Sequence, residues 1–358
     1  MKKVFAVTAA LALLGLGIAA QADVFNLGTG FTNLETVTVG DPGNAGDFRY
    51  GTAYQGSEGG PASFGSVGYN YNIGKYEVTA KQYADFLNNK ASASDPYGLY
   101  NTSMDTANNP NGCNIKRASV SGNYTYTVAD DWANRPVNYI DFWDALRFAN
   151  WLNNGQGNGD TETGAYTLGG YNGPDGLTIQ RNAGARWFLT NEDEWYKAAY
   201  YKGGGTDAGY WDYPTQSDTE PSNVGSDGYA DPGNHANYEI NSNYTIGSPY
   251  YRTNVGEFEK SASAYGTFDQ GGNVFEWNEG IDGTIRVERG GAANDGGHSA
   301  YHLRAAYRGE NRPDNGGPIH GFRIAGVPAG WEPVPEPSSI IALAGALISL
   351  LGIRRRRA

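Results

Sequence analysis

Residues 186–195 read Arg-Trp-Phe-Leu-Thr-Asn-Glu-Asp-Glu-Trp, and this stretch contains the start of a helix. We predict that Thr190 opens a helix over residues 191–200, because three acidic residues, 192–194, fall in its first turn. Negative side chains at that position interact favourably with the partial positive charge of a helix N-terminus. The stretch therefore predicts a capped helix in the middle of the chain.

Two earlier segments carry equally clear helix starts. Thr79-Ala80-Lys81-Gln82 is a capping box ahead of Tyr83, Phe86 and Leu87. Asp141 opens a predicted helix over residues 142–152, whose apolar residues recur at helical spacing. Outside these helices the chain is punctuated by Gly, Asn, Asp and Pro, and residues 202–256 have no sustained periodicity. No repeat of 20 to 50 residues is apparent, which argues against a solenoid or propeller.

The composition favours a loop-rich fold with aromatic packing. The chain has 52 Gly, 26 Tyr and 8 Trp, and Cys113 is its single cysteine, so no intramolecular disulfide can form. Core burial must supply the stability. Residues 23–61 are predicted to form a strand or two and loops, and we assign no chemistry to them.

The N-terminus has the layout of a secretory signal peptide. Lys2 and Lys3 precede an apolar run over residues 4–20, and small residues lead to Asp23. We therefore expect residues 1–22 to be a signal peptide and Asp23 to begin the mature chain. The alternative is a buried N-terminal helix.

The C-terminus, residues 328–358, is organised as a linker and a tail. Pro335-Glu336-Pro337 precedes an apolar run over residues 340–353 and then four arginines, 354–357. The run is shorter than the roughly 20 residues that span a bilayer comfortably, and the arginines favour the cytoplasmic side. This order resembles the PEP-CTERM sorting signal, which implies recognition and removal by an exosortase. The alternative is an ordinary tail anchor. We expect transient membrane association through this tail and a final location in the cell envelope, on the outer surface or in the extracellular matrix.

The mature domain is strongly acidic. Without the terminal Lys and Arg residues it has 20 basic and 38 acidic residues, a net charge of −18. Such a surface repels nucleic acid and anionic lipid headgroups. Cations, neutral glycans and basic proteins are the expected partners.

Six motifs occur in a recognisable order. They are Ile73 to Thr79, Arg135 to Tyr139 with the helix after it, Arg186 to Trp195, Gly271 to Trp277, Arg289-Gly290-Gly291 and Gly321-Phe322-Arg323. The series resembles the formylglycine-generating enzyme (sulfatase-modifying factor) family over residues 62–327. The resemblance implies an α+β, C-type-lectin-like fold with little regular secondary structure.

In the family's enzymes, two cysteines after the Arg-Gly-Gly motif hold a copper ion, and molecular oxygen oxidises a sulfatase cysteine to formylglycine at this site. The equivalent positions here are Asp295 and Ala300, and Ala292 replaces the usual serine. Copper(I) selects soft thiolate ligands, which these side chains lack. We therefore expect no copper and no oxidation of the copper-thiolate type.

The resemblance also implies structural calcium. The family's ligands correspond to Asp269, Gly272, Val274 and Glu276, two carboxylates and two carbonyls, which suit calcium. The alternative is that Glu276 forms a salt bridge with a core arginine such as Arg289 or Arg304. A second site would use Asn237 and the carbonyl of Tyr238, with the remaining ligands unplaced.

Two further groups of residues are candidates. Asp295, His298 and His302, with His320 further on, would form a transition-metal site if their segment were helical, but residues 294–297 indicate a turn. Ordinary loop histidines are the alternative. The aromatic residues of 210–214 with Tyr244, Tyr250 and Tyr251 are candidates for a glycan- or peptide-binding surface, or for core packing.

The sequence leaves three hypotheses of function. The first is a noncatalytic, calcium-stabilised lectin-like module that binds a polysaccharide or protein. The second is an oxidoreductase of the same family with altered chemistry in the Asp295, His298 and His302 pocket. The third is a purely structural matrix protein, which the absence of low-complexity repeats disfavours.

Overall fold

The computed structural model describes residues 31–50, 63–118, 122–224, 233–296 and 299–328. The predicted signal peptide, the apolar and arginine segments of the predicted sorting tail, and His298 lie outside these residues. The strands are β1 Thr36–Val39, β2 Tyr71–Gly74, β3 Lys116–Ala118, β4 Thr125–Thr127, β5 Trp187–Leu189, β6 Glu239–Ile240, β7 Asn243–Tyr244, β8 Phe275–Asp282, β9 Ile285–Arg289, β10 Gly309–Asn311, β11 His320–Gly321 and β12 Ile324–Gly326. The α-helices are α1 Ala80–Lys90, α2 Asp130–Ala133, α3 Phe142–Asn153 and α4 Glu192–Tyr200, and the 3-10 helices are η1 Thr102–Met104 and η2 Ser299–Leu303.

One antiparallel sheet brings the two ends of the domain together. Its strand order is β1-β2-β12-β5, so the first described strand and the last belong to the same sheet. Ile73 of β2 lies between Val37 of β1 and Ala325 of β12, and all three side chains are buried. Strand β1 therefore belongs to the domain, although it lies in the segment 23–61 that the sequence separates from the domain at residue 62.

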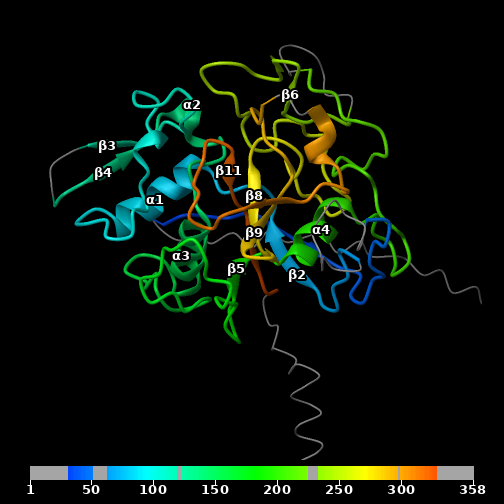
Figure 1. Ribbon diagram of the computed structural model, residues 1–358, viewed down its shortest axis with the longest axis horizontal. Helices are drawn as coiled ribbons and strands as arrows, with labels where there is room; N and C mark the ends of the chain where they lie inside the picture. Colours follow the sequence, from blue (N-terminus) through cyan, green and yellow to red (C-terminus); the bar gives the residue numbers. More distant parts are fainter. Residues whose placement is uncertain (1–30, 51–62, 119–121, 225–232, 297–298, 329–358) are drawn as a thin grey trace, which may run out of the picture.

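The second sheet carries the segments of interest for function. Its order is β10-β9-β8-β11, with β11 parallel to β8 and the other pairs antiparallel. Glu276 of β8 lies opposite Arg289, the last residue of β9. In Figure 1 this sheet occupies the centre of the molecule, with α1, α2 and α3 on one side and α4 and η2 on the other.

The three predicted helices form, and their first turns are closed by side chains. Thr79 and Gln82 make the predicted capping box of α1, and Asp141 opens α3 as expected. In α4 the N-cap is Asn191 and not Thr190, because the Asn191 side chain accepts from the backbone N–H of Glu194. The predicted start was therefore wrong by one residue, and Asn191 is a cap residue of the favoured type.

Aromatic side chains fill the core between α1, α3 and the first sheet. Tyr83, Phe86, Phe148, Trp151 and Phe322 are buried and contact one another, with ring centroids 5.2 to 6.5 Å apart. Aromatic pairs of this kind add to the free energy of burial. The expectation of aromatic packing is therefore correct.

Regular structure is sparse elsewhere. Between α4 and β8 the described residues contain only the two short strands β6 and β7 and a few isolated bridges. The mixture of helix and sheet with low helical content agrees with the α+β class. Within the described ranges, every helix is too short or too polar to cross a membrane.

Candidate functional site

The segment after β9 packs closely because of two glycines. Gly290 and Gly291 both have positive φ, 102° and 76°. A Cβ on Gly290 would lie 2.8 Å from the carbonyl oxygen of Gln270, and one on Gly291 would lie 2.8 Å from Leu303 of η2. Glycine avoids both clashes and adopts this conformation without strain. The pair therefore lets η2 lie directly against the end of the strand.

Asp295 and His302 form a pair in this segment. A turn at residues 293–294 and a bend at 295–296 cover the described part of the turn expected at 294–297, and Asp295 Oδ2 lies 2.6 Å from His302 Nδ1. The two side chains are 4% and 11% exposed. The His302 ring packs on Tyr307, with centroids 4.1 Å apart, and lies 5.6 Å from the ring of Phe275. The carboxylate orients the imidazole in a mostly buried, aromatic setting.

Neither position equivalent to a family cysteine resembles a thiolate site. Asp295 is hydrogen-bonded to His302, and Ala300 is fully buried in a small apolar cluster with Leu303. Cys113, the only cysteine of the chain, is buried in the main core instead, where desolvation raises the pKa of its thiol. No second thiol exists to complete a copper site.

His320 has partners of its own. Its Nδ1 accepts from the backbone N–H of Gly317 at 2.9 Å, and its Nε2 lies 3.3 Å from Glu288 Oε2. Burial lowers the pKa of His320 to about 4 and raises the pKa of Glu288 to about 8. Both groups are therefore neutral near pH 7, and the structure ties His320 to Glu288 of β9 while Asp295 is paired with His302.

The calcium ligands implied by the family differ in their surroundings. Glu276 is fully buried, and its carboxylate accepts from Arg323 Nε and Nη2 at 2.6 Å each and from Trp195 Nε1 at 2.6 Å. Asp269 Oδ2 accepts a hydrogen bond from the backbone N–H of Gly256 at 2.6 Å, and burial raises the pKa of Asp269 to about 6. Asp269 therefore suits a hard cation, whereas Glu276 is already neutralised by a guanidinium.

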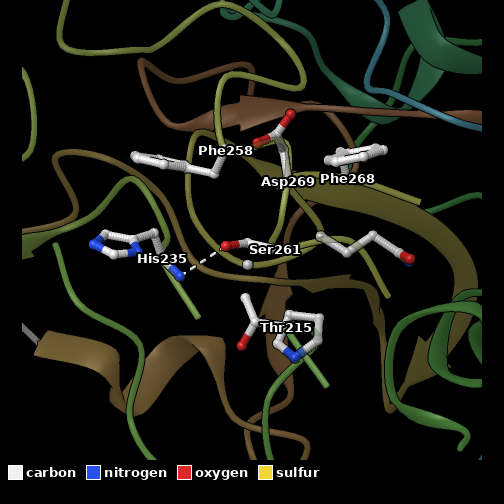
Figure 2. A pocket seen from close by; sticks show the side chains of 9 residues that line it. Thr215, His235, Phe258, Ser261, Phe268 and Asp269 are labelled. Atoms are coloured by element: carbon white, nitrogen blue, oxygen red, sulfur yellow. Dashed lines mark hydrogen bonds between the residues drawn. The ribbon is translucent and has the colours of Figure 1, made fainter. Parts of the chain in front are cut away.

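The other two residues of the implied calcium site, Gly272 and Val274, lie in the segment just before β8. Gly272 donates to the carbonyl of Gly290, and Val274 is buried directly before β8. Asp269 also lines a small hollow of about 10 Å³, as Figure 2 shows, with its carboxylate turned away from Thr215 and Ser261. The hollow is about the size of one water molecule.

The second proposed calcium site does not fit. Asn237 Oδ1 is buried without a hydrogen-bond partner, but its Nδ2 donates to Tyr251 O and Asn273 Oδ1, and neither partner offers a carboxylate. The carbonyl of Tyr238 accepts from Thr245 at 3.2 Å. One free amide oxygen is a poor donor set for calcium. Among the residues that the structure describes, no group of three or more His, Cys, Asp and Glu is arranged to hold a metal ion.

Sequence reasoning missed two residues here. Arg323, at the end of the Gly-Phe-Arg motif, is the partner of Glu276, in place of the Arg289 or Arg304 that the sequence offered. Arg289 pairs with Glu192 of α4 instead, at 2.7 Å. Glu77, in the first motif, is buried and has no hydrogen-bond partner for either oxygen among the described residues. The one signal for both was a charged residue between apolar neighbours.

The aromatic candidates divide between core and surface. Tyr210 and Tyr213 are 7% and 5% exposed and belong to apolar clusters. Tyr250 is covered by the guanidinium of Arg135, 3.9 Å from its ring centre, whereas Tyr244 is 38% exposed. Because some of these side chains are buried in apolar clusters and others are exposed, residues 210–214 and the tyrosines of 244–251 do not form a single aromatic surface.

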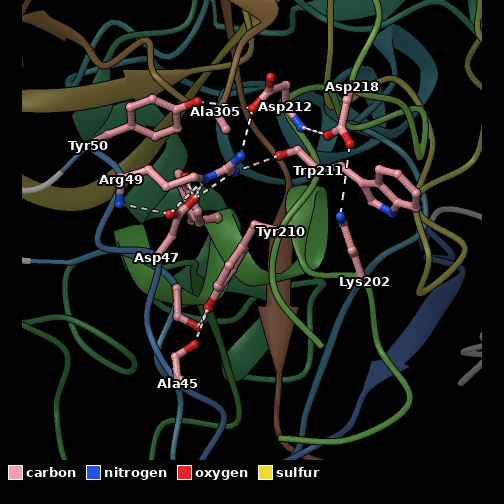
Figure 3. A network of polar contacts seen from close by, with 12 residues as sticks. Ala45, Asp47, Arg49, Tyr50, Lys202, Tyr210, Trp211, Asp212, Asp218 and Ala305 are labelled. Carbon is pink, nitrogen blue, oxygen red and sulfur yellow. Dashed lines mark hydrogen bonds and ion pairs between the residues drawn. The ribbon is translucent and has the colours of Figure 1, made fainter. Parts of the chain in front are cut away.

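Polar side chains surround Trp211 in one fixed network. Arg49 pairs with Asp47 and with Asp212, each at 2.8 Å, and Lys202 lies 4.1 Å from the ring centre of Trp211. Figure 3 shows these groups side by side. Beside them lies a hollow of about 400 Å³ whose lining residues are Ala45, Gly46, Asp47, Arg49, Lys202, Asp207, Gly209 and Tyr210. Side chains that are held in this way offer preset donors and acceptors.

The fold and the arrangement around the twin glycines define the class of protein. The model of the Sulfatase-modifying factor enzyme 1-like domain matches residues 32–327, which includes β1 and ends after β12. The chain therefore belongs to the sulfatase-modifying factor family. No curated protein matches it.

Three solved structures are similar to this chain. Variable protein 1 of Treponema denticola is 20% identical, with 83% of this chain and 96% of that chain covered and a TM-score of 0.49. A crystal structure of CarF is 21% identical, with 82% and 98% covered and a TM-score of 0.45. PvdO from Pseudomonas aeruginosa is 18% identical, with 83% and 95% covered and a TM-score of 0.45.

Proposed function

We propose that this chain is an exported, noncatalytic binding module of the sulfatase-modifying factor family with a C-type-lectin-like fold. This proposal rests on the two residues that replace the copper-binding cysteines of the family's enzymes. One holds Asp295, bound to His302, and the other holds the buried methyl group of Ala300. Without a thiolate pair the chain lacks the soft ligands that copper(I) requires.

The purified protein provides a direct test of this loss. It is incubated with copper(I), oxygen and a peptide that carries a sulfatase cysteine motif, and the peptide is analysed by mass spectrometry. We expect no aldehyde product. An active member of the family serves as the positive control, and conversion of the cysteine by this chain at a comparable rate would contradict the proposal.

Export and sorting belong to the same proposal. The signal peptide over residues 1–22 and the Pro-Glu-Pro, apolar and arginine segments after residue 334 support delivery to the envelope or the extracellular matrix. In this proposal an exosortase-type machinery removes the tail. Mass spectrometry of the released protein tests this, because the mature chain should begin at Asp23 and lack the arginine cluster.

The network around Trp211 supports a neutral glycan as the ligand. Arg49 is held by Asp47 and Asp212 at the edge of the hollow, and Lys202 lies over the indole ring of Trp211. Sugars combine hydroxyl groups with apolar ring faces, so they match fixed polar groups next to an aromatic side chain. The net negative charge of the domain disfavours acidic polysaccharides.

Retention on a glycan array tests the ligand class. We expect the wild-type protein to be retained by neutral glycans, and Arg49→Ala and Trp211→Ala to lose most of this retention. Arg312→Ala is the matched control, because Arg312 is an exposed arginine in a similar pair with Asp314. Equal retention of all variants would exclude this surface, and binding of a basic protein partner would then be the remaining form of the proposal.

The second candidate function is an enzyme with altered chemistry. The hydrogen bond between Asp295 and His302 favours it, because a carboxylate that orients an imidazole is a common arrangement for proton transfer. Metal analysis of the purified protein distinguishes the two candidates. One equivalent of a transition metal that His302→Ala removes would favour the enzyme.

A further inference from the structure

Three carboxylates, two of them on fully buried residues, lie around one guanidinium. They are Glu77, Asp269 and Glu276, and the guanidinium belongs to Arg323. The Glu276 carboxylate accepts two hydrogen bonds from Arg323 and one from Trp195, so both of its oxygens are engaged. This ion pair is neutral as a unit.

The backbone holds the other two carboxylates close to the same guanidinium. Arg323 Nη2 donates to the carbonyl of Phe268 at 2.8 Å, and the backbone N–H of Phe268 donates to the carbonyl of Lys75 at 2.8 Å. Asp269 directly follows Phe268, and Glu77 follows Lys75 by two residues. The two carboxylates therefore belong to two hydrogen-bonded segments that meet at Arg323.

Glu77 has no ion-pair or hydrogen-bond partner of its own among the described residues, although the guanidinium of Arg323 lies near enough to act on its charge. Its residue is 2% exposed, and neither carboxylate oxygen has a hydrogen-bond donor among the described residues. The largest charge acting on it is the like charge of Asp269. A buried carboxylate without a donor or a counter-charge is strongly unfavourable. The site therefore requires a positive charge or a proton.

The charges of this cluster match one divalent cation. Glu276 and Arg323 cancel, which leaves the negative charges of Glu77 and Asp269. The Lys75 ammonium does not supply the balance, because it is 31% exposed and pairs with Glu35 at the surface. Hard carboxylate oxygens are the ligands that calcium prefers.

We propose that Asp269 and Glu77, rather than Glu276, are the two carboxylates that bind calcium in this chain. This inference rests on the structural calcium that the family resemblance implies and changes the identity of its second acidic ligand. Glu276 instead serves as the partner of Arg323. The described residues contain no group of three or more His, Cys, Asp and Glu side chains that could hold a metal ion. The proposed site uses only two carboxylates, together with main-chain carbonyls.

Calcium binding to the full-length protein tests this assignment, with calorimetric titration and melting temperature in calcium and in EDTA as the readouts. We expect Glu77→Gln to weaken calcium binding by about 10- to 100-fold, the range typical of lost metal-site groups. In EDTA this variant should melt close to wild type, because burial raises the pKa of Glu77 and keeps its carboxyl protonated when no cation is bound. A purely structural role for Glu77 would instead lower the melting temperature in both conditions.

Two other variants complete the test. Glu276→Gln leaves the buried guanidinium of Arg323 without its counter-charge, so this variant should melt lower in both conditions. It should keep most of the increase in melting temperature that calcium causes. Glu35→Gln is the matched control, because Glu35 is 51% exposed in its side chain and should change neither readout. If Glu77→Gln does not fold, Glu77→Asp keeps the charge on a shorter side chain and should fold with weakened calcium binding.

The outcomes separate the two proposals. If the wild-type protein binds no calcium and its melting temperature is the same in calcium and in EDTA, both the structural calcium and this assignment are wrong. If wild type binds calcium, Glu77→Gln binds it equally and Glu276→Gln does not, calcium stands and the assignment to Glu77 is overturned.

Discussion

The carboxylate of Glu276 and the guanidinium of Arg323 form two hydrogen bonds of 2.6 Å with both side chains almost fully buried. Glu276 lies on β8 of the second sheet, and Arg323 directly precedes β12 of the first sheet. The pair therefore joins the two sheets at the centre of the domain.

Replacing Arg323 should destabilise the protein severely. Arg323→Met leaves Glu276 buried without its counter-charge, and breaking a buried pair in this way costs about 3–5 kcal/mol. Urea unfolding followed by tryptophan fluorescence measures the loss. Arg312→Met is the control, because Arg312 is 62% exposed in its side chain, and exposed pairs contribute about 1 kcal/mol or less. Equal losses in the two variants would show that the buried pair has no special weight.

The N-cap of α4 can be assigned by two substitutions. Asn191→Ala removes the side chain that accepts from Glu194 N–H at 2.8 Å and should cost about 1 kcal/mol. Thr190→Val should be close to neutral, because Thr190 Oγ1 is buried without a hydrogen-bond partner. Thermal unfolding of both variants measures the difference. A larger loss for Thr190→Val would restore Thr190 as the cap.

Glu288 should make the stability depend on pH. Burial raises its pKa from 4.5 to about 8, so the folded state binds this proton more strongly than the unfolded state. Its contribution is fully present below about pH 4.5 and is lost as the pH rises to about 8. We expect Glu288→Gln to reduce the decline in melting temperature between these values. An unchanged decline in the variant would show that Glu288 is ionised in the folded protein.

Cys113 should be inert in the folded protein. It is fully buried, and desolvation raises the pKa of its thiol, so little thiolate forms and reagents cannot reach it. Ellman's reagent should therefore label it only after unfolding in guanidinium chloride. Fast labelling of one thiol in the native protein would contradict the buried position.

Short-range features were predicted well because their physics is local. The capping boxes at Thr79 and Asp141 involve residues three apart, and both form as expected. The one-residue error at Thr190 arose because Thr and Asn are both good caps and stand next to each other. The turn predicted at residues 294–297 is found in its described part, residues 294–296, whereas His302 lies in the 3-10 helix η2.

Pairing between distant residues was predicted poorly. The sequence offered Arg289 or Arg304 as partners of Glu276, but Glu192 of α4 binds Arg289 and also Arg308. Arg323 is therefore the arginine that reaches Glu276, 47 positions away. Nothing in the local pattern distinguishes these arginines, because burial and distance depend on how the strands pair.

By itself, the sequence determined the family, the order of its motifs and the absence of a second thiol, because these depend only on which residues are present and in what order. The tertiary structure decided which carboxylates are neutralised and which are left without a partner. Glu276 is hydrogen-bonded to a guanidinium, because the segment before β12 places Arg323 against β8, whereas Glu77 has no hydrogen-bond partner among the described residues. A charge in a protein interior is governed by its neighbours in space, and those come from every part of the chain.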